Sequence, residues 1–187
     1  MKIRIVQRKY FFLTSKYEIF INGKIQYRAN SEVFTLRSKI KIKDLNDSTL
    51  YELKRFFFSD KRFLNFQLID LKRNKKAKIK SKSFIEHIII AQNLEINCYE
   101  QKGNDIGLFI HGNQVGILSK NKKKKLNQDI YDIEISENLI EPELIIGFCL
   151  SFDYTFHNDS SISFTTVDYG NKRIKPIIEV DPKWKDK

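Results

Sequence analysis

One apolar run near the carboxyl end constrains the fold of this chain more than any other feature. Residues 139–156, LIEPELIIGFCLSFDYTF, leave no polar face at helical spacing. A helix that is apolar all round is either buried on every side or lies in a membrane. The continuous part, residues 144–156, is shorter than the ~20 apolar residues that a spanning helix needs, and it contains Asp153. We therefore predict a buried core helix over about residues 139–157, with Pro142 in its first turn.

The segments before this run carry the signals of antiparallel hairpins. Asn22-Gly23 separates two β-prone segments, and this pair favours a type I′ turn because both central positions need a positive φ. His111-Gly112 lies in a second turn of this kind. The runs between polar turns predict about twelve strands. Residues 50–57 also fit a short helix capped by Asp47 or Ser48, although the neighbouring pattern favours a strand.

A degenerate repeat supports the hairpins. The pattern Phe-x-Leu-x-x-Lys-x-x-Ile begins at Phe11, recurs from Phe34 and recurs more loosely from Phe56, with polar turns between the copies. We interpret each copy as a strand end, a corner and a strand start, with Phe and Leu inward and Lys on the rim. Residues 1–157 should then form one mainly β domain, an antiparallel barrel of about twelve strands that encloses the central hydrophobic C-terminal helix. Residues 158–187 are expected to form a polar tail, with one edge strand at 162–167 and a flexible end.

This order of elements resembles a known superfamily. Hairpins that lead into one wholly apolar helix, together with the opening KYFFLTSKYEIFINGKIQYRA, are similar to the tubby C-terminal-domain-like superfamily, which includes the LURP-one-related proteins and the phospholipid scramblases. The resemblance covers about residues 2–157 and is to the small bacterial single-domain members. It implies a twelve-stranded barrel threaded by its helix and, more remotely, lipid contact. The phosphoinositide-binding Lys/Arg pocket of tubby proteins has no match by position here. The palmitoylated Cys-rich segment and the terminal spanning helix of scramblases also have no counterpart in this sequence.

The charge of the chain indicates an anionic partner or only high solubility. The net charge is +11, and the partners that this favours are anionic phospholipids, an acidic protein or, with less support, nucleic acid. Lys outnumbers Arg, which weakens the case for specific phosphate recognition. The basic residues either converge at one barrel end as an anion-binding patch or form two separately solvated turns. The candidate residues are Lys72, Arg73, Lys75, Lys76, Lys78 and Lys80, and then Lys120, Lys122, Lys123, Lys124 and Lys125.

The sequence shows no pattern typical of catalysis or of metal binding. His87, His111 and His157 are separated from one another, and Cys98 and Cys149 form no metal-type pair. A nucleophile elbow and a Gly-rich phosphate loop are both missing. We expect a non-enzymatic binding module without a cofactor, which contacts anionic lipid through basic loops. The alternatives are a protein-interaction scaffold and a charge-driven nucleic-acid binder. The amino terminus resembles no signal segment, so a cytoplasmic, membrane-peripheral location is expected.

Overall fold

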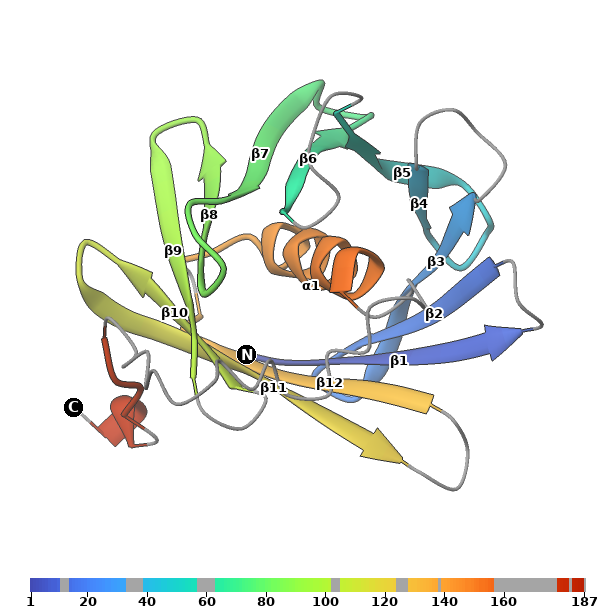
Figure 1. The fold of residues 1–187 in the computed structure, drawn as a ribbon. Coiled ribbons are helices and arrows are strands. Elements are labelled where there is room, and N and C mark those ends of the chain that lie inside the picture. The colour runs from blue at the N-terminus through green and yellow to red at the C-terminus, as the bar shows by residue number, and fades with distance from the viewer. Residues whose placement is uncertain are drawn as a thin grey trace.

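The computed structural model shows a closed antiparallel β-barrel that surrounds a long helix (Figure 1). It describes residues 1–10, 14–32, 39–56, 63–101, 105–123, 128–137, 139–156, 178–181 and 183–186. Twelve strands are found in these ranges, as predicted from the hairpin signals. They are β1 (Lys2–Tyr10), β2 (Thr14–Ile21), β3 (Lys24–Glu32), β4 (Lys39–Lys43), β5 (Thr49–Arg55), β6 (Asn65–Asp70), β7 (Lys75–Ser81), β8 (Glu86–Ala91), β9 (Leu94–Glu100), β10 (Asp105–Ile110), β11 (Asn113–Lys123) and β12 (Gln128–Ile135).

The barrel has the simplest possible topology. Each strand pairs with its neighbours in sequence, and β1 closes the barrel by pairing with β12. The turns follow the sequence signals, because Asn22 and Gly23 both have a positive φ, of 48° and 80°. Residues 50–57 were open to a helical interpretation, but Thr49–Arg55 form β5.

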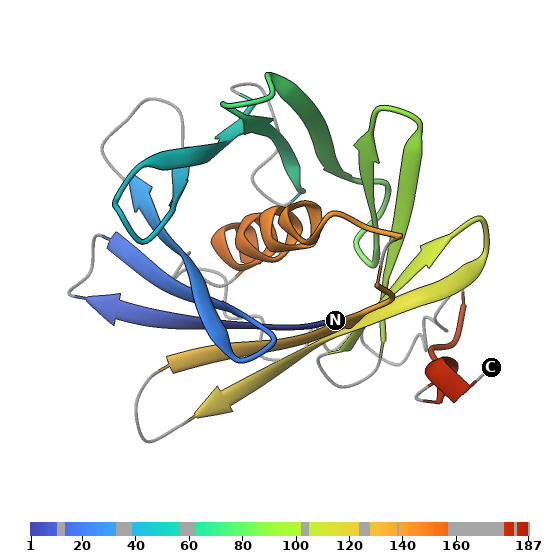
Figure 2. The same cartoon turned by 180° about the vertical axis from the view of Figure 1, so that it is seen from behind.

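The predicted core helix is present inside the barrel (Figures 1 and 2). Helix α1 spans Pro142–Phe156, and the side chains of Ile145, Ile146 and Phe148 are fully buried. The helix begins later than predicted, because Pro142 takes the first helical position, where its missing N–H costs nothing. Leu139 therefore precedes the helix, and it is 57% exposed rather than buried.

The two ends of the barrel differ, and we name them by the helix. In a barrel of sequential antiparallel strands, the connections alternate between the two ends. We call the end at which α1 begins the proximal end and the end at which α1 finishes the distal end. The proximal connections are residues 22–23, 44–48, 71–74, 92–93, 111–112 and 136–141.

The repeat is confirmed in part. Its last position is buried in all three copies, at Ile19, Ile42 and Leu64. The inward placement of Phe56 is wrong, since this side chain is 42% exposed. Leu53 points inward on β5, so strand alternation places Phe56 on the outer face. The other Phe and Leu positions of the repeat, at 11, 13, 34, 36 and 58, lie outside the described residues.

The described end of the chain lies against the outer wall of the barrel. Gln114 on β11 exchanges two hydrogen bonds with the backbone of Asp181, at 3.2 and 2.9 Å. Val180 packs onto Gly107 of β10, where a Cβ would lie 2.3 Å from a methyl carbon of Val180. A short 3₁₀ turn, η2 (Trp184–Asp186), follows. The predicted edge strand at 162–167 lies outside the described residues.

Candidate functional site

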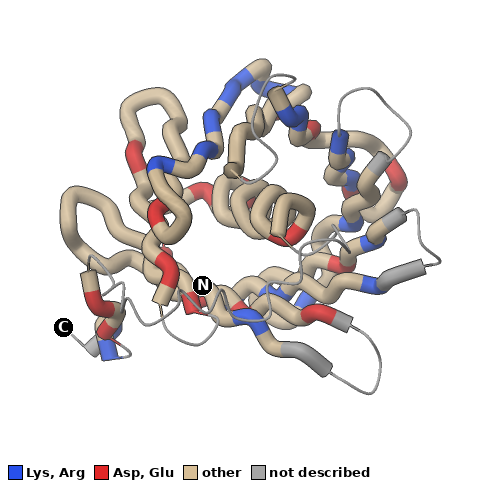
Figure 3. The backbone as a smooth tube through the Cα atoms, in the orientation of Figure 1, with Lys and Arg blue, Asp and Glu red and all other residues tan. Residues whose placement is uncertain are grey.

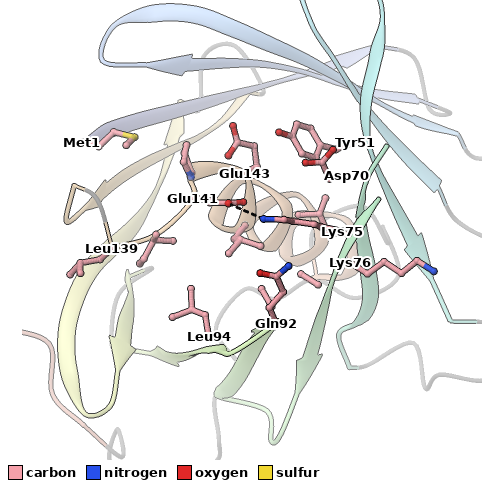
Figure 4. A pocket seen from close by; sticks show the side chains of 16 residues that line it. Met1, Tyr51, Asp70, Lys75, Lys76, Gln92, Leu94, Leu139, Glu141 and Glu143 are labelled. Atoms are coloured by element: carbon pink, nitrogen blue, oxygen red, sulfur yellow. Dashed lines mark ion pairs between the residues drawn. The ribbon is translucent and has the colours of Figure 1, made fainter. Parts of the chain in front are cut away.

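A cavity opens at the proximal end of the barrel, beside the start of α1 (Figure 4). Its volume is about 430 Å³, which is within the range of ligand-binding pockets. Ala77 on β7 and Ala91 on β8 are direct cross-strand partners and both line the cavity. Because both side chains are small, they leave a space between the barrel wall and the first turn of α1 that the helix does not fill. The remaining apolar walls come from Leu68, Leu94, Ile140 and Leu144.

An exposed cluster of charges borders the cavity. The Glu141 carboxylate lies 3.6 Å from a guanidinium nitrogen of Arg73 and 4.0 Å from the ammonium of Lys75. Figure 4 shows Lys75 extended toward Glu141, whereas the ammonium of Lys76, whose side chain also lines the cavity, points away from Glu141. The three paired side chains are each about half exposed, and exposed ion pairs at such distances contribute little stability. An anion that makes shorter contacts could therefore replace Glu141 as the partner of Arg73 and Lys75.

Two tyrosines lie near the start of the helix. The Tyr27 hydroxyl donates a hydrogen bond of 2.7 Å to Glu143, and the rings of Tyr27 and Tyr51 pack edge to face with centroids 6.3 Å apart. Burial, followed by this hydrogen bond, raises the pKa of Tyr27 well above its usual range. Burial and the charge of Glu143 raise the pKa of Tyr51 to about 12. Both hydroxyls are therefore neutral at physiological pH, and Glu143 is held by Tyr27.

The first predicted basic cluster is exposed and continuous with this site. Asp70 accepts hydrogen bonds from the backbone N–H groups of Lys72 and Arg73, at 2.9 and 2.8 Å, which closes the β6–β7 turn. Along β7, exposed lysines alternate with the buried Ala77 and Ile79. The blue segments of the tube in Figure 3 mark where these cations lie along the strand. No ion pair joins Lys72, Lys76, Lys78 or Lys80 to any residue that the structure describes. We call Lys72, Arg73, Lys75, Lys76, Lys78 and Lys80 the β7 basic ridge; all six are exposed.

The second predicted basic cluster does not join the first. In the order of the barrel wall, β8, β9 and β10 lie between β7 and β11. The β6–β7 turn is at the proximal end, whereas β11 runs toward the distal end. The prediction that Lys120–Lys125 form one loop is also wrong, because β11 continues to Lys123. Lys120 is only 6% exposed and points into the barrel. The side chains of Lys122 and Lys123, and the whole of Lys124 and Lys125, lie outside what the structure describes.

Lys120 belongs to a buried network that holds the helix. Its ammonium lies 3.1 Å from Asp129, 4.0 Å from Asp153 on α1 and 5.1 Å from the centre of the Tyr131 ring. One oxygen of Asp153 accepts hydrogen bonds from Tyr17 at 2.7 Å and Gln7 at 2.8 Å, and the other accepts one from Tyr131. Burial raises the pKa of Asp153, while Lys120 and the two tyrosine hydroxyls oppose the rise. This network ties the helix to β1, β2 and β12.

His87 also has a structural environment. Its Nδ1 lies 2.9 Å from the Ser81 hydroxyl and its Nε2 lies 2.8 Å from the Glu100 carboxylate. The Glu100 carboxylate accepts a hydrogen bond from Nε2–H, and the Ser81 oxygen also accepts the backbone N–H of Leu64. The ring packs against three helix phenylalanines, and none of the three polar residues lines the proximal cavity.

The sequence interpretation missed three exposed leucines. Leu45, Leu71 and Leu139 are 49%, 45% and 57% exposed, and all three lie in proximal connections. A signal was available, because two of them stand inside polar turns, as Asp44-Leu45-Asn46 and Asp70-Leu71-Lys72.

The fold and the site together define a class of protein. A closed barrel of twelve antiparallel strands around one C-terminal helix is the tubby-like architecture, here with a cavity at one end and a basic ridge that runs from that end along β7. The chain belongs to the LURP-one-related family, whose model matches residues 2–153. That family is part of the tubby-like superfamily. No curated protein matches the chain.

Helix α1 has too few residues for a span, and no other helix within the described ranges is long and apolar enough.

Proposed function

We propose that this protein is a non-enzymatic binding module that contacts anionic phospholipid surfaces through its proximal end. The observation that supports this most is the placement of unpaired cations beside exposed leucines. Lys72 and Lys76 have no ion-pair partner among the described residues, and Leu71 precedes Lys72 directly. Peripheral proteins that bind anionic membranes combine the same two elements, cations for the head groups and apolar side chains for the acyl boundary.

The expected energies are sufficient for reversible binding. A cation near an anionic bilayer contributes about 1 kcal/mol. Partial insertion of exposed leucines adds about 25 cal/mol for each Å² of apolar surface removed from water. The net charge of +11 brings the protein to such a surface at low salt. Binding should therefore weaken as salt screens the cations.

Vesicle flotation tests the proposal with two matched variants. The double substitution Lys72→Gln, Lys76→Gln removes two unpaired cations of the β7 basic ridge. The control, Arg28→Gln, Lys183→Gln, removes two exposed cations from β3 and the C-terminal segment, which likewise form no ion pair in the described chain. At about 1 kcal/mol per cation, the first variant should bind anionic vesicles roughly thirtyfold more weakly than the control.

Three results would count against membrane contact. The first is equal binding to neutral and anionic vesicles. The second is equal loss of binding in both variants, which would mean that only net charge matters. The third is binding to single-stranded nucleic acid at a salt concentration that abolishes vesicle binding, which would favour the charge-driven nucleic-acid binder instead.

A further inference from the structure

The proximal cavity has the dimensions and the lining of a site for an apolar chain. Its volume of about 430 Å³ is enclosed mainly by aliphatic side chains, and the paired Ala77 and Ala91 keep it open. Leu139 lines the cavity and is also the most exposed of the proximal leucines, so an apolar path leads from the surface inward. Water in such a space gains few hydrogen bonds, and an alkyl chain would replace it favourably.

The charges at the rim favour an anionic head group. Among the described residues, the ion pairs of Arg73 and Lys75 are long, exposed contacts to Glu141, so these two cations are the ones available to a head group at the rim. The other carboxylates that line the cavity already accept hydrogen bonds. Glu143 accepts one from Tyr27, and Asp70 accepts two from the backbone of its own turn. An anionic head would pair with Arg73 and Lys75 once it displaces Glu141, and it would have to lie away from the carboxylates of Asp70 and Glu143, which also line the cavity.

We propose that the proximal cavity binds one acyl chain that carries an anionic head group, with the chain against Ala77, Ala91 and Leu94 and the head between Arg73 and Lys75. This inference rests on the proposed function, since the chain would come from the surface that the proximal end contacts. It adds a specific ligand class, a single-chain anionic amphiphile, and a role for Glu141. Glu141 occupies the head-group position when no ligand is bound.

The first experiment needs no variant. Linear carboxylates from hexanoate to myristate, each below its micellar concentration, are titrated into the full-length protein by calorimetry. The affinity should rise about fourfold for each added methylene and then level off when the cavity is full. Alkylammonium ions of the same lengths should bind more weakly. A flat dependence on chain length, or tighter binding of the ammonium series, would overturn the proposal.

Two substitutions then locate the ligand. Ala91→Phe fills the cavity and should abolish carboxylate binding, while Asn93→Phe, which adds the same ring at an exposed position of the next turn, should not. Glu141→Gln releases Arg73 and Lys75 and should tighten carboxylate binding about two- to fivefold. Unchanged binding in Ala91→Phe, with a native thermal transition, would contradict the assignment of the cavity, as would weaker binding in Glu141→Gln.

The outcomes separate this inference from the proposed function. If vesicles bind but carboxylates show no chain-length dependence, the membrane contact stands and the acyl-chain site is wrong. If carboxylates bind in the cavity and vesicles do not, the acyl-chain site stands and the surface contact is wrong.

Discussion

Removal of one buried hydroxyl tests how the helix is held in the barrel. Tyr131 is fully buried, and its hydroxyl donates to an oxygen of Asp153 that accepts no other described hydrogen bond. Tyr131→Phe leaves the ring in place and removes this charge-assisted bond, at a cost of about 1.5–3 kcal/mol. Tyr17→Phe should cost less, because Gln7 still donates to the Asp153 oxygen that Tyr17 contacts.

Urea unfolding and thermal unfolding measure these differences. In a chain of this size, the Tyr131→Phe substitution should lower the midpoint temperature by roughly 3–12 °C. Tyr99→Phe is the control, because Tyr99 lies on the outer wall, beside Phe109, and should change stability by less than about 0.5 kcal/mol. The reasoning is refuted if Tyr131→Phe is as stable as the Tyr99 control, or if Tyr17→Phe is the more damaging of the two.

Two further predictions concern the outer wall and acid stability. Gly107→Ala should displace the C-terminal segment, because the new Cβ would collide with Val180, and faster hydrogen exchange at residues 178–181 would show it; unchanged protection would contradict the packing. Burial raises the pKa of Glu52, but hydrogen bonds from Lys39 and Lys54, together with their charges, hold this pKa below its usual value of 4.5. The stability from this group is therefore present above pH 4.5 and is lost as the pH falls. The stability gap between wild type and Glu52→Gln should shrink on acidification, and a constant gap would exclude this linkage.

Much of the fold follows from local patterns in the sequence. The apolar run predicts the core helix because residues 144–156 have no polar face and are stable only when they are buried on every side. Asn22-Gly23 predicts its turn because this pair readily adopts the positive φ angles that the turn needs. The apolar pattern does not fix the first residue of the helix, since Leu139 and Ile140 extend the apolar run before Pro142. Composition does not distinguish an apolar residue inside the helix from one in the loop that precedes it.

The position of the second basic cluster could also have been predicted from the sequence. Lys120 stands two residues after buried Leu118, and Asp129 stands two residues before buried Tyr131, so strand alternation places both side chains inside the barrel. Sequential antiparallel strands also put the connection after the sixth strand and the connection after the eleventh at opposite ends. The two basic clusters could therefore have been separated by counting strands.

The cavity was not predictable in this way. It depends on how far α1 extends toward the proximal end and on which small side chains face it there. Ala77 and Ala91 are ordinary strand residues in the sequence, and only the β7–β8 register makes them partners at the level of the first helical turn.

Site-specific fluorescence gives the most direct test of which end of the barrel meets a membrane. The native thiols of Cys98 and Cys149 are buried, and burial raises the pKa of each, so a polarity-sensitive label should react with an introduced cysteine alone. Leu71→Cys at the proximal end and Phe84→Cys at the distal end are matched, with exposures of 45% and 47%. On addition of anionic vesicles, the label at residue 71 should shift to the blue and brighten, while the label at residue 84 should not change. A shift at residue 84 alone, or equal shifts at both residues, would contradict the account.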